Sequence, residues 1–303
     1  MSGSNNLSNT IISASTAFSA RFDKGVDLAV TDYLKVATVV PSTSATTGYG
    51  FLSRFPKAKK WVGERAINRL SSSDYQIKNE KFESTVGIPR DDFEDNDYGK
   101  YTPVFEDMGR EAAEFPNEHI FSLLSQGFEV ACYDGQNFFD LEHPVGKTGE
   151  AQSNILINDA DNPPEGESWF LLDCSRSLKP LIWQERATPE LESKTDAANS
   201  DHVFMLDEIL YGIRARGNGG FSFWQLAAAS KEELNTDNFN ALYQMMTKRK
   251  DEEKRPMHIS PTLLVVPPSL RQQAHDVINK EFNKLGESNI NFKIVDVYVC
   301  PYL

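Results

Sequence analysis

The chain has 303 residues, of which 40% are apolar, and it can bury the core of one large domain or of two to three ordinary ones without disulfides. Its 44 acidic and 31 basic residues give a net charge of −13, which opposes binding to nucleic acid through overall charge. Three widely spaced cysteines with no CxxC pair argue against a disulfide framework or a thiolate zinc site, and indicate synthesis in a reducing cytosol.

The N-terminal region predicts an arm. It lacks the charged start and apolar core of a signal peptide, and no apolar run reaches the ~18 residues of a membrane span, so we expect a soluble protein. Residues 9–29 place apolar side chains at helical spacing and predict an amphipathic helix. Residues 33–40 alternate and predict a strand that ends at Pro41, followed by a loop over 42–50. These elements cannot enclose a core alone, so we expect them to lie on another part of the structure.

The next segment, 54–97, predicts a long β-hairpin. Two stretches rich in β-forming residues, 54–70 and 75–88, flank the turn sequence SSSD. Strands of about fifteen residues would project roughly 50 Å. Because an isolated two-stranded ribbon is marginal in water, we expect it to pack against another part of the fold or against another subunit.

The charges along this predicted hairpin are unevenly distributed. Residues 54–69 hold six basic side chains and one acidic one, whereas residues 83–97 hold six acidic and one basic. A hairpin that turns at Ser72 leaves most of the acids beyond its base, so we hypothesise that the basic segment contacts the acidic segment of a neighbouring subunit. Two solvated faces of opposite sign would explain the same charges. The candidate interface residues are Lys57, Lys59, Lys60, Trp61 and Arg65 on the basic segment, and Asp91, Asp92, Glu94, Asp95 and Asp97 on the acidic one.

A long helix is predicted over residues 101–128, where an apolar stripe runs for more than ~30 Å and Pro116 should kink or interrupt it. Residues 169–186 and 202–230 predict strands broken by glycine and asparagine, with a turn at 217–220.

The C-terminal part predicts a small layered α/β unit. A helix over 236–250 precedes a buried strand at 262–266, a second helix starts at Ser269, and residues 292–300 form another strand. Helices alternating with strands in this way are typical of an α/β layer arrangement.

The stretch CYDGQNFFDLEHPVG at 132–146 invites a catalytic interpretation. Cys132 as nucleophile and His143 as base would make a thiol-dependent hydrolase, but such a dyad is defined by spatial geometry. Zinc bound by Cys132, Asp140 and His143 lacks the usual ligand spacing. A buried structural cysteine is the commoner case.

The acidic stretch invites a calcium interpretation. A loop that starts at Asp95 has Asp97 in third and Glu106 in twelfth position, but Lys100 occupies the sixth position, where the turn requires glycine. A calcium-dependent structural module therefore stays an alternative to a solvated or intersubunit acidic face.

The sequence contains no serine-nucleophile motif, phosphate loop or dinucleotide fingerprint, so we predict no enzymatic activity and no cofactor or metal.

Six blocks of the sequence occur in the order typical of one family. They extend from about Phe51 to about Leu270, and together they are specific although no single block is decisive. The chain therefore resembles the Mu-like phage major head subunit family of capsid proteins. The blocks are FLSRFPKAKKWVGER, KFESTVGIPRDDFEDNDYG, CYDGQNFFDLEHPV, WFLLDCSRSLKPLIWQER, YGIRARGNGGFSFWQLA and SPTLLVVPPSLRQQA.

The resemblance implies an α+β fold, the Hong-Kong-97-type phage capsid fold. Mapped onto this chain it implies an N-terminal arm (1–50), an extended E-loop hairpin (51–100), a peripheral domain with a long spine helix (101–190), an α/β axial domain (191–290) and a closing strand that returns to the peripheral domain (291–303). It also implies that the stretch 132–146 is a structural block, in which Tyr133, Phe138 and Phe139 anchor packing while Asp134, Gly135 and Gly146 shape turns.

The implied function is that of a major capsid protein, which assembles into hexamers and pentamers of an icosahedral shell around double-stranded DNA without reading its sequence. The implied partners are other copies of the chain, a scaffold or protease, the portal and possible decoration proteins, with no membrane. The implied location is the virion, after assembly in the bacterial host cytoplasm. Some capsids of this fold join lysine to asparagine covalently; Lys57, Lys78 or Lys81 would be candidates here, but the sequence shows no environment for that bond.

Overall fold

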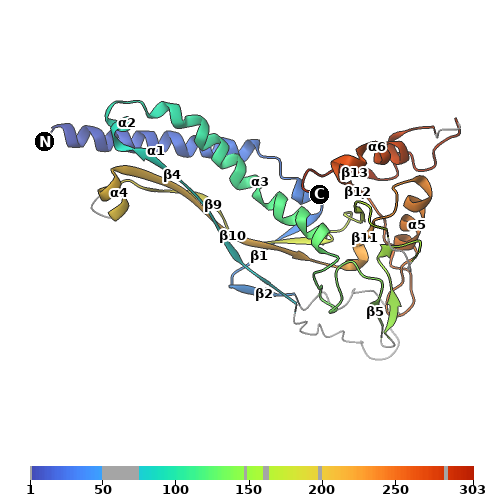
Figure 1. Ribbon diagram of the computed structural model, residues 1–303. Helices are drawn as coiled ribbons and strands as arrows, with labels where there is room; N and C mark the ends of the chain where they lie inside the picture. Colours follow the sequence, from blue (N-terminus) through green and yellow to red (C-terminus); the bar gives the residue numbers. More distant parts are fainter. Residues whose placement is uncertain (1, 50–74, 147–148, 160–163, 197–199, 283–285) are drawn as a thin grey trace.

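The computed structural model describes residues 2–49, 75–146, 149–159, 164–196, 200–282 and 286–303. They form an elongated α+β molecule in which a long sheet with helices along it leads into an α/β unit that holds the C-terminal elements (Figure 1). None of the described helices is long and apolar enough to cross a membrane.

The predicted N-terminal helix and long helix are confirmed, and they pack on each other. These helices are α1 (Ser2–Leu28) and α3 (Thr102–Gln126). Phe18 of α1 stacks on Phe105 of α3 with ring centroids 4.1 Å apart. Pro116 is buried inside α3 without ending it. The N-terminal arm therefore lies on its own chain.

A pair of glycines sets how closely these two helices approach. A β-carbon on Gly109 would lie 2.0 Å from the carbonyl oxygen of Phe22, and one on Gly25 would lie 1.9 Å from that of Glu106. Both distances are far below a van der Waals contact, so the two backbones meet where neither helix carries a side chain.

The long sheet has four strands in the order β1-β9-β10-β4, with β1 parallel to β9 and the other neighbours antiparallel. The strand predicted at 33–40 starts only at Ala37, because Asp32–Lys35 form a 3₁₀ turn. The four strands are β1 (Ala37–Pro41), β4 (Glu80–Pro89), β9 (Leu181–Lys194) and β10 (Glu208–Phe221).

The second half of the predicted hairpin is not a free ribbon. These residues include β4 (80–89), and every residue of β4 is paired with a residue of β10 in the segment 208–217. Just before it, β3 (Gln76–Lys78) pairs with β2 (Thr46–Gly48), within the segment predicted as a loop. The first half of the predicted hairpin and its SSSD turn lie outside the described residues.

The predicted turn at Gly217–Gly220 is also wrong, since β10 continues through it while paired with β9. The glycines serve close packing instead. A β-carbon on Gly217 would lie 2.8 Å from the Trp183 ring, and one on Gly220 would lie 2.2 Å from Ile77. Residues 202–206, predicted as strand, belong to the short helix α4 (Asp201–Leu206) between β9 and β10.

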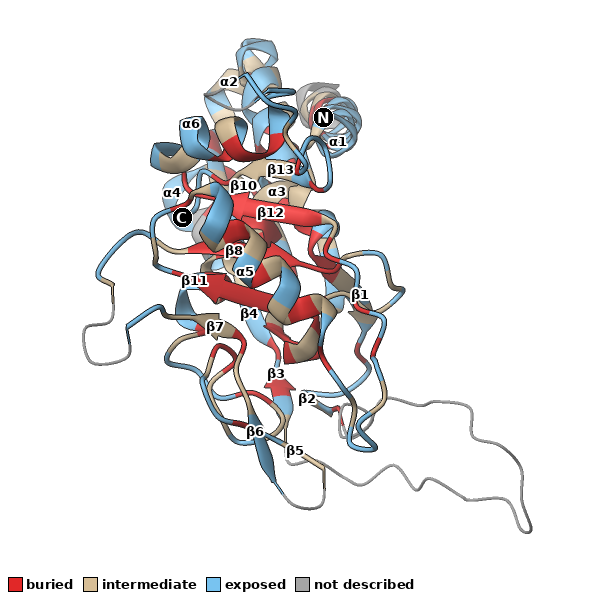
Figure 2. Ribbon diagram, turned by 90° about the vertical axis from the view of Figure 1, so that its right-hand side faces the viewer, coloured by how far each residue is buried: buried red, intermediate tan, exposed pale blue. Residues whose placement is uncertain are grey.

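The predicted α/β unit is confirmed as a five-stranded sheet in the order β13-β12-β8-β11-β7. Every residue of β8, β11 and β12 is buried (Figure 2). Two helices belong to this unit, α5 (Thr236–Thr247) and α6 (Arg271–Ala274), the latter lengthened by a turn at His275–Asn279. The strands are β7 (Ile155–Leu156), β8 (Trp169–Leu172), β11 (Ala227–Ser230), β12 (Leu263–Val266) and β13 (Asp296–Val299).

The predicted boundary between the peripheral and axial domains, between residues 190 and 191, lies within the 14-residue strand β9. The closing strand β13 pairs in parallel with β12, so it completes the α/β unit. This unit is therefore built from segments on both sides of the long strands β9 and β10.

Candidate functional site

The stretch 132–146 forms the compact connection between α3 and β5 (His143–Val145), which pairs with β6 (Glu150–Gln152). Phe138 and Phe139 are fully buried, and Phe138 stacks on Phe221 at 4.3 Å. Tyr133 packs edge-on against Phe223 at 6.0 Å. Gly135 and Gly146 have positive φ angles of 89° and 72°, so the predicted packing anchors and turns are confirmed.

Within this connection Asp134 joins the cysteine to the histidine. The Cys132 thiol donates to Asp134 Oδ1 at 3.1 Å, and His143 Nδ1 lies 2.8 Å from Asp134 Oδ2. The His143 ring is fully buried and stacks on Trp224 at 4.0 Å. Asp140, considered in the sequence as a third zinc ligand and not favoured there, accepts the backbone N–H of Glu142.

The electrostatics of this cluster oppose thiol catalysis. Burial raises the pKa of the Cys132 thiol well above its usual range, and the negative charge of Asp134 raises it further. Burial alone would raise the pKa of Asp134, but the hydrogen bonds from His143 and Cys132 outweigh it and hold that pKa below its ordinary value. A nucleophile needs a thiolate activated by a base, whereas here the ionised group is the carboxylate between them. The hydrolase alternative is therefore unsupported.

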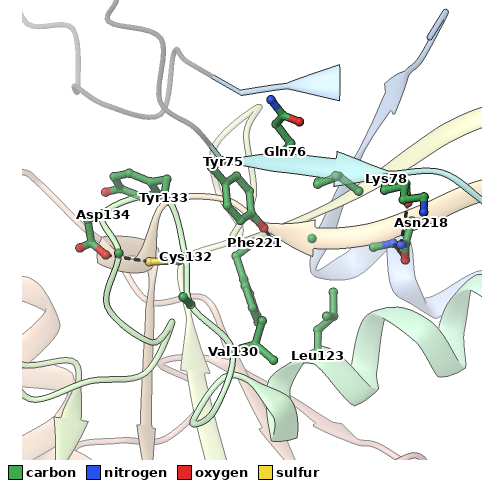
Figure 3. A pocket seen from close by; sticks show the side chains of 15 residues that line it. Tyr75, Gln76, Lys78, Leu123, Val130, Cys132, Tyr133, Asp134, Asn218 and Phe221 are labelled. Carbon is green, nitrogen blue, oxygen red and sulfur yellow. Dashed lines mark hydrogen bonds between the residues drawn. The ribbon is translucent and has the colours of Figure 1, made fainter. Parts of the chain in front are cut away.

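A hollow of about 660 Å³ opens beside this cluster, between the 130–135 loop, β3 and the end of β10 (Figure 3). Cys132 and Asp134 line it, yet they point toward each other and share a hydrogen bond. Across the hollow, the hydroxyl oxygen of Tyr75 accepts a hydrogen bond from the backbone N–H of Phe221 at 2.6 Å. Cys132, Asp134 and His143 are also the one group of three close metal-ligand atoms in the described part of the chain, within 4.8 Å of one another. Each carboxylate oxygen of Asp134 already has a hydrogen-bond partner inside this group, Oδ1 with Cys132 and Oδ2 with His143.

Sequence reasoning missed the buried guanidinium that supports this region. Arg249 follows α5 and is 4% exposed. Its Nη1 donates to the carbonyl oxygens of Trp224, Gln225 and Ala227, and its guanidinium lies 5.2 Å from the Trp224 ring centroid. Burial lowers the pKa of Arg249 to about 9. The contacts fix the backbone that leads into β11, which is a structural role.

The predicted acidic residues lie at the opposite end of the molecule, at α2 (Arg90–Glu94) and the turn after it (Figure 1). Lys100 Nζ lies 3.0 Å from Asp92 Oδ1 and 2.7 Å from Asp97 Oδ2. Glu94 pairs with Arg90 at 3.5 Å. Asp91 and Asp95 are exposed and form no salt bridge within the described ranges. Their predicted counterparts, Lys57, Lys59, Lys60, Trp61 and Arg65, lie outside the described residues.

The same contacts weaken the calcium interpretation. Lys100 stands in the sixth position of the supposed loop, and its ammonium group binds Asp97, the third residue of that loop, at 2.7 Å. Glu106, the twelfth residue of the supposed loop, instead binds Lys24 of α1 at 2.9 Å. A calcium loop needs these carboxylates to converge on one ion.

The sequence comparisons give a consistent result. A model of the family described as Mu-like prophage major head subunit gpT matches residues 11–303. The chain is 43% identical over 297 residues to the major capsid protein of Escherichia phage Mu, covering 95% of this chain and 96% of that protein. It is 42% identical over 269 residues to the major head subunit of the Mu-like prophage FluMu of Haemophilus influenzae, covering 87% of each.

Solved structures agree with the sequence relatives. A chain from the procapsid of bacteriophage JBD30 has a TM-score of 0.85 and 46% identity, covering 97% of this chain and 98% of that one. A chain from the JBD30 capsid has a TM-score of 0.77 and 33% identity, covering 90% of this chain and 91% of that one.

Proposed function

Because the chain belongs to the family of Mu-like prophage major head subunits, we propose that its copies assemble as hexamers and pentamers into an icosahedral shell that encloses double-stranded DNA. This family consists of structural capsid proteins rather than enzymes. The observation that carries the proposal is the similarity to a procapsid chain over nearly the full length of both chains.

The elements suit the parts of a Hong-Kong-97-type subunit. We assign α1 to the N-terminal arm, α3 to the spine helix, and the sheet β1-β9-β10-β4 to the peripheral domain. The axial domain is the unit around the sheet β13-β12-β8-β11-β7, and the E-loop is the segment between β2 and β3 together with those two strands. In such a shell axial domains meet around each ring, and a heterologous contact that closes needs only one kind of interface per subunit.

The charged segments provide the contact between neighbours. The basic residues of 54–69 meet acids at the α2 end of an adjacent subunit, and Asp91 and Asp95 are the two predicted acids that have no salt bridge of their own in the described structure. One salt bridge at an exposed surface adds little to the free energy of association, but a closed shell repeats the same salt bridge in every subunit.

Partners follow from the relatives. The JBD30 capsid is decorated with minor capsid protein trimers, and we propose that comparable trimers bind the shell formed by this chain. A scaffold or protease and a portal complete the head, which assembles in the bacterial host cytoplasm. The net charge of −13 fits a container that holds DNA without binding it tightly.

Negative-stain microscopy and sedimentation velocity of the purified chain test the proposal. We expect rings or shells whose amount rises with protein concentration. The Cys132→Ala variant and a chelator are matched controls, and neither should change the particles. A compact monomer at every concentration would contradict the proposal, whereas particles lost only in the variant would revive a role for the thiol.

A further inference from the structure

Arg249 carries a buried positive charge that no acidic side chain balances among the described residues. Its Nη1 donates to three backbone carbonyl oxygens, including those of Trp224 and Ala227 at 3.2 Å. Its Nε and Nη2 are also buried, and neither has a hydrogen-bond partner in the described structure. Burial lowers the pKa of Arg249, and the one described group that opposes this shift is Tyr133, which is not a carboxylate. Because a buried charge without a counter-charge is costly, this guanidinium is suited to bind an anion.

A hollow of about 290 Å³ lies beside Arg249, where the end of α5 meets the end of β6. Gln152 Nε2 donates to the carbonyl oxygen of Lys250 at 3.3 Å, which joins the two segments. No acidic side chain is among the described residues that line this hollow, and we call it the basic hollow. Its lining residues are Gln152, Ser153, Met245, Lys248, Arg249 and Lys250.

Three acidic side chains on the segments that flank the basic hollow pair with other bases. Asp251 and Glu253 contact Arg255, with N–O distances of 3.1 and 3.2 Å. Glu150 of β6 contacts Lys254 at 3.3 Å. Each of these acids would have to leave its present salt bridge before it could neutralise the basic hollow.

The two lysines of the basic hollow have no acidic partner. Lys248 and Lys250 are exposed, and neither forms a salt bridge in the part of the chain that the structure describes. Lys248 Nζ donates to Gln244 Oε1 at 3.0 Å, which is an uncharged group. The partial negative charge at the C-terminal end of α5 repels anions, so the three bases rather than the helix dipole would have to hold one.

We propose that the basic hollow binds a phosphate group through Arg249, Lys248 and Lys250. The Nε and Nη2 atoms form one edge of the guanidinium, and such a fork matches two oxygens of a phosphate, while ammonium groups bind phosphate as point charges. Three bases without an acid favour an oxyanion of more than one negative charge over a carboxylate, which has a single charge. The proposal goes beyond the shell function and does not depend on it.

The size of the basic hollow limits what else enters with the phosphate group. Its volume of about 290 Å³ lies just below the ~300–1,000 Å³ of pockets that hold drug-sized ligands, so a single phosphate group fits better than a whole nucleotide. Two sources supply this chemistry, inorganic phosphate and the backbone of DNA. Inorganic phosphate reaches a buried guanidinium more easily, because a backbone phosphate must bring its sugars with it.

Isothermal titration calorimetry of the full chain with inorganic phosphate, in chloride buffer at constant ionic strength, tests the site. We expect saturable binding of one phosphate per chain. Lys248→Met combined with Lys250→Met should raise the dissociation constant about tenfold or more, because each lysine supplies a charged hydrogen-bond donor. The control Lys231→Met removes an exposed lysine of the same unit that does not line the basic hollow. No saturable binding by the parent, or equal constants in the parent and the double variant, would overturn the site.

Acetate and a short DNA duplex identify the chemistry and the source of the ligand. Acetate that binds as tightly as phosphate would overturn the assignment to phosphate. A duplex that binds the parent and is displaced by inorganic phosphate would identify the DNA backbone as the source, whereas phosphate binding without DNA binding would identify the free ion. DNA binding that is unchanged in the double lysine variant would place the DNA on another surface and leave inorganic phosphate as the ligand.

Thermal unfolding tests the part that the guanidinium plays. Phosphate that binds the folded chain alone should raise the Tm of the parent with increasing concentration, and by more than chloride of equal ionic strength. Arg249→Lys keeps the charge but removes the fork, so the rise should be lost in this variant. Its Tm in chloride should also be lower, since the carbonyl contacts of Arg249 are weakened. An equal phosphate-dependent rise in both chains would refute the role of Arg249.

Discussion

The α/β unit and the long sheet use their strands in different ways. Strands β8, β11 and β12 are buried along their whole length, and β8 is flanked by neighbours on both sides. In β9 the first four residues, Leu181–Gln184, are buried, whereas those from Glu185 onward are exposed or half-buried. β4 buries one residue of ten, Ile88. The long sheet thus leaves most of its outer part uncovered.

The difference shows where each half obtains its stability. A strand buried on both faces is stabilised by its own core, because each apolar side chain leaves water on folding. A sheet covered along one face by α1 and α3 keeps an open face and an open edge (Figure 1). In a subunit of a shell, that surface is available to other copies.

The largest expected effect is in the α/β unit. Phe170 in the central strand β8 is fully buried, and its ring lies 5.3 Å from that of Phe139. Phe170→Ala should lower the free energy of unfolding by about 3–5 kcal/mol. Chemical denaturation measures this, with Thr188→Ala on the exposed part of β9 as a control that should stay within about 0.5 kcal/mol. Equal decreases in the free energy of unfolding of the two variants would contradict the difference in stability between the α/β unit and the outer part of the long sheet.

A smaller effect is expected where α1 meets α3. In Gly109→Ala the new methyl group overlaps the carbonyl oxygen of Phe22, so α1 must shift. Overpacking of this kind costs about 1–3 kcal/mol, although alanine is itself a better helix former by up to about 1 kcal/mol. Limited proteolysis should cleave α1 faster than in the parent. Gly99→Ala, where a β-carbon meets nothing within 4 Å, is the control. Identical cleavage would mean that α1 does not depend on this contact.

The Asp134 cluster should show a pH dependence. Its pKa is lower in the folded chain than its ordinary value near 4, so ionised Asp134 stabilises the fold above about pH 4 and this contribution is lost as the pH falls through the folded pKa. Asp134→Asn should cost about 1–3 kcal/mol at pH 7, because the amide cannot accept from both Cys132 and His143. The free energy of unfolding, measured from pH 7 to pH 2, should therefore fall less steeply with decreasing pH in the variant than in the parent. The exposed control Glu233→Gln should show the same pH dependence as the parent.

The smallest expected effect is at the α2 end. Hydrogen bonds from Tyr101 and then from Lys100 lower the pKa of Asp92. Tyr101→Phe and Lys100→Met should each raise that pKa, as NMR titration of the Asp92 carboxyl can measure, and neither variant should change with added calcium. An unchanged Asp92 pKa in both variants, or a response to calcium, would contradict this account of the acidic end.

Much of the architecture follows from local patterns in the sequence. The helical spacing of Phe105, Met108, Ala112 and Phe115 predicts α3, and the continuous run at 262–266 predicts β12, because both patterns depend on which neighbours in sequence share a buried face. The turn residues Gly135 and Gly146 also act locally, and their positive φ angles agree with the prediction.

The errors arose where distant segments decide the outcome. Residues 75–88 have the composition of a hairpin arm, but only the pairing with 208–217, more than a hundred residues away, shows that they belong to the sheet. The sequence GNGG is typical of a turn, yet its glycines make room for Trp183 and Ile77. Likewise the pattern at Cys132 and His143 does not reveal that Asp134 lies between them or that Arg249 supports the ring stacked on His143.

Hydrogen–deuterium exchange of the chain before and after assembly tests most directly whether the open side of the long sheet is completed by other copies. We predict that β4 and the residues of α3 with exposed side chains gain protection in particles, while β8, β11 and β12 exchange equally slowly in both states. Particles in which β4 and α3 exchange as fast as in the free chain would contradict this central claim.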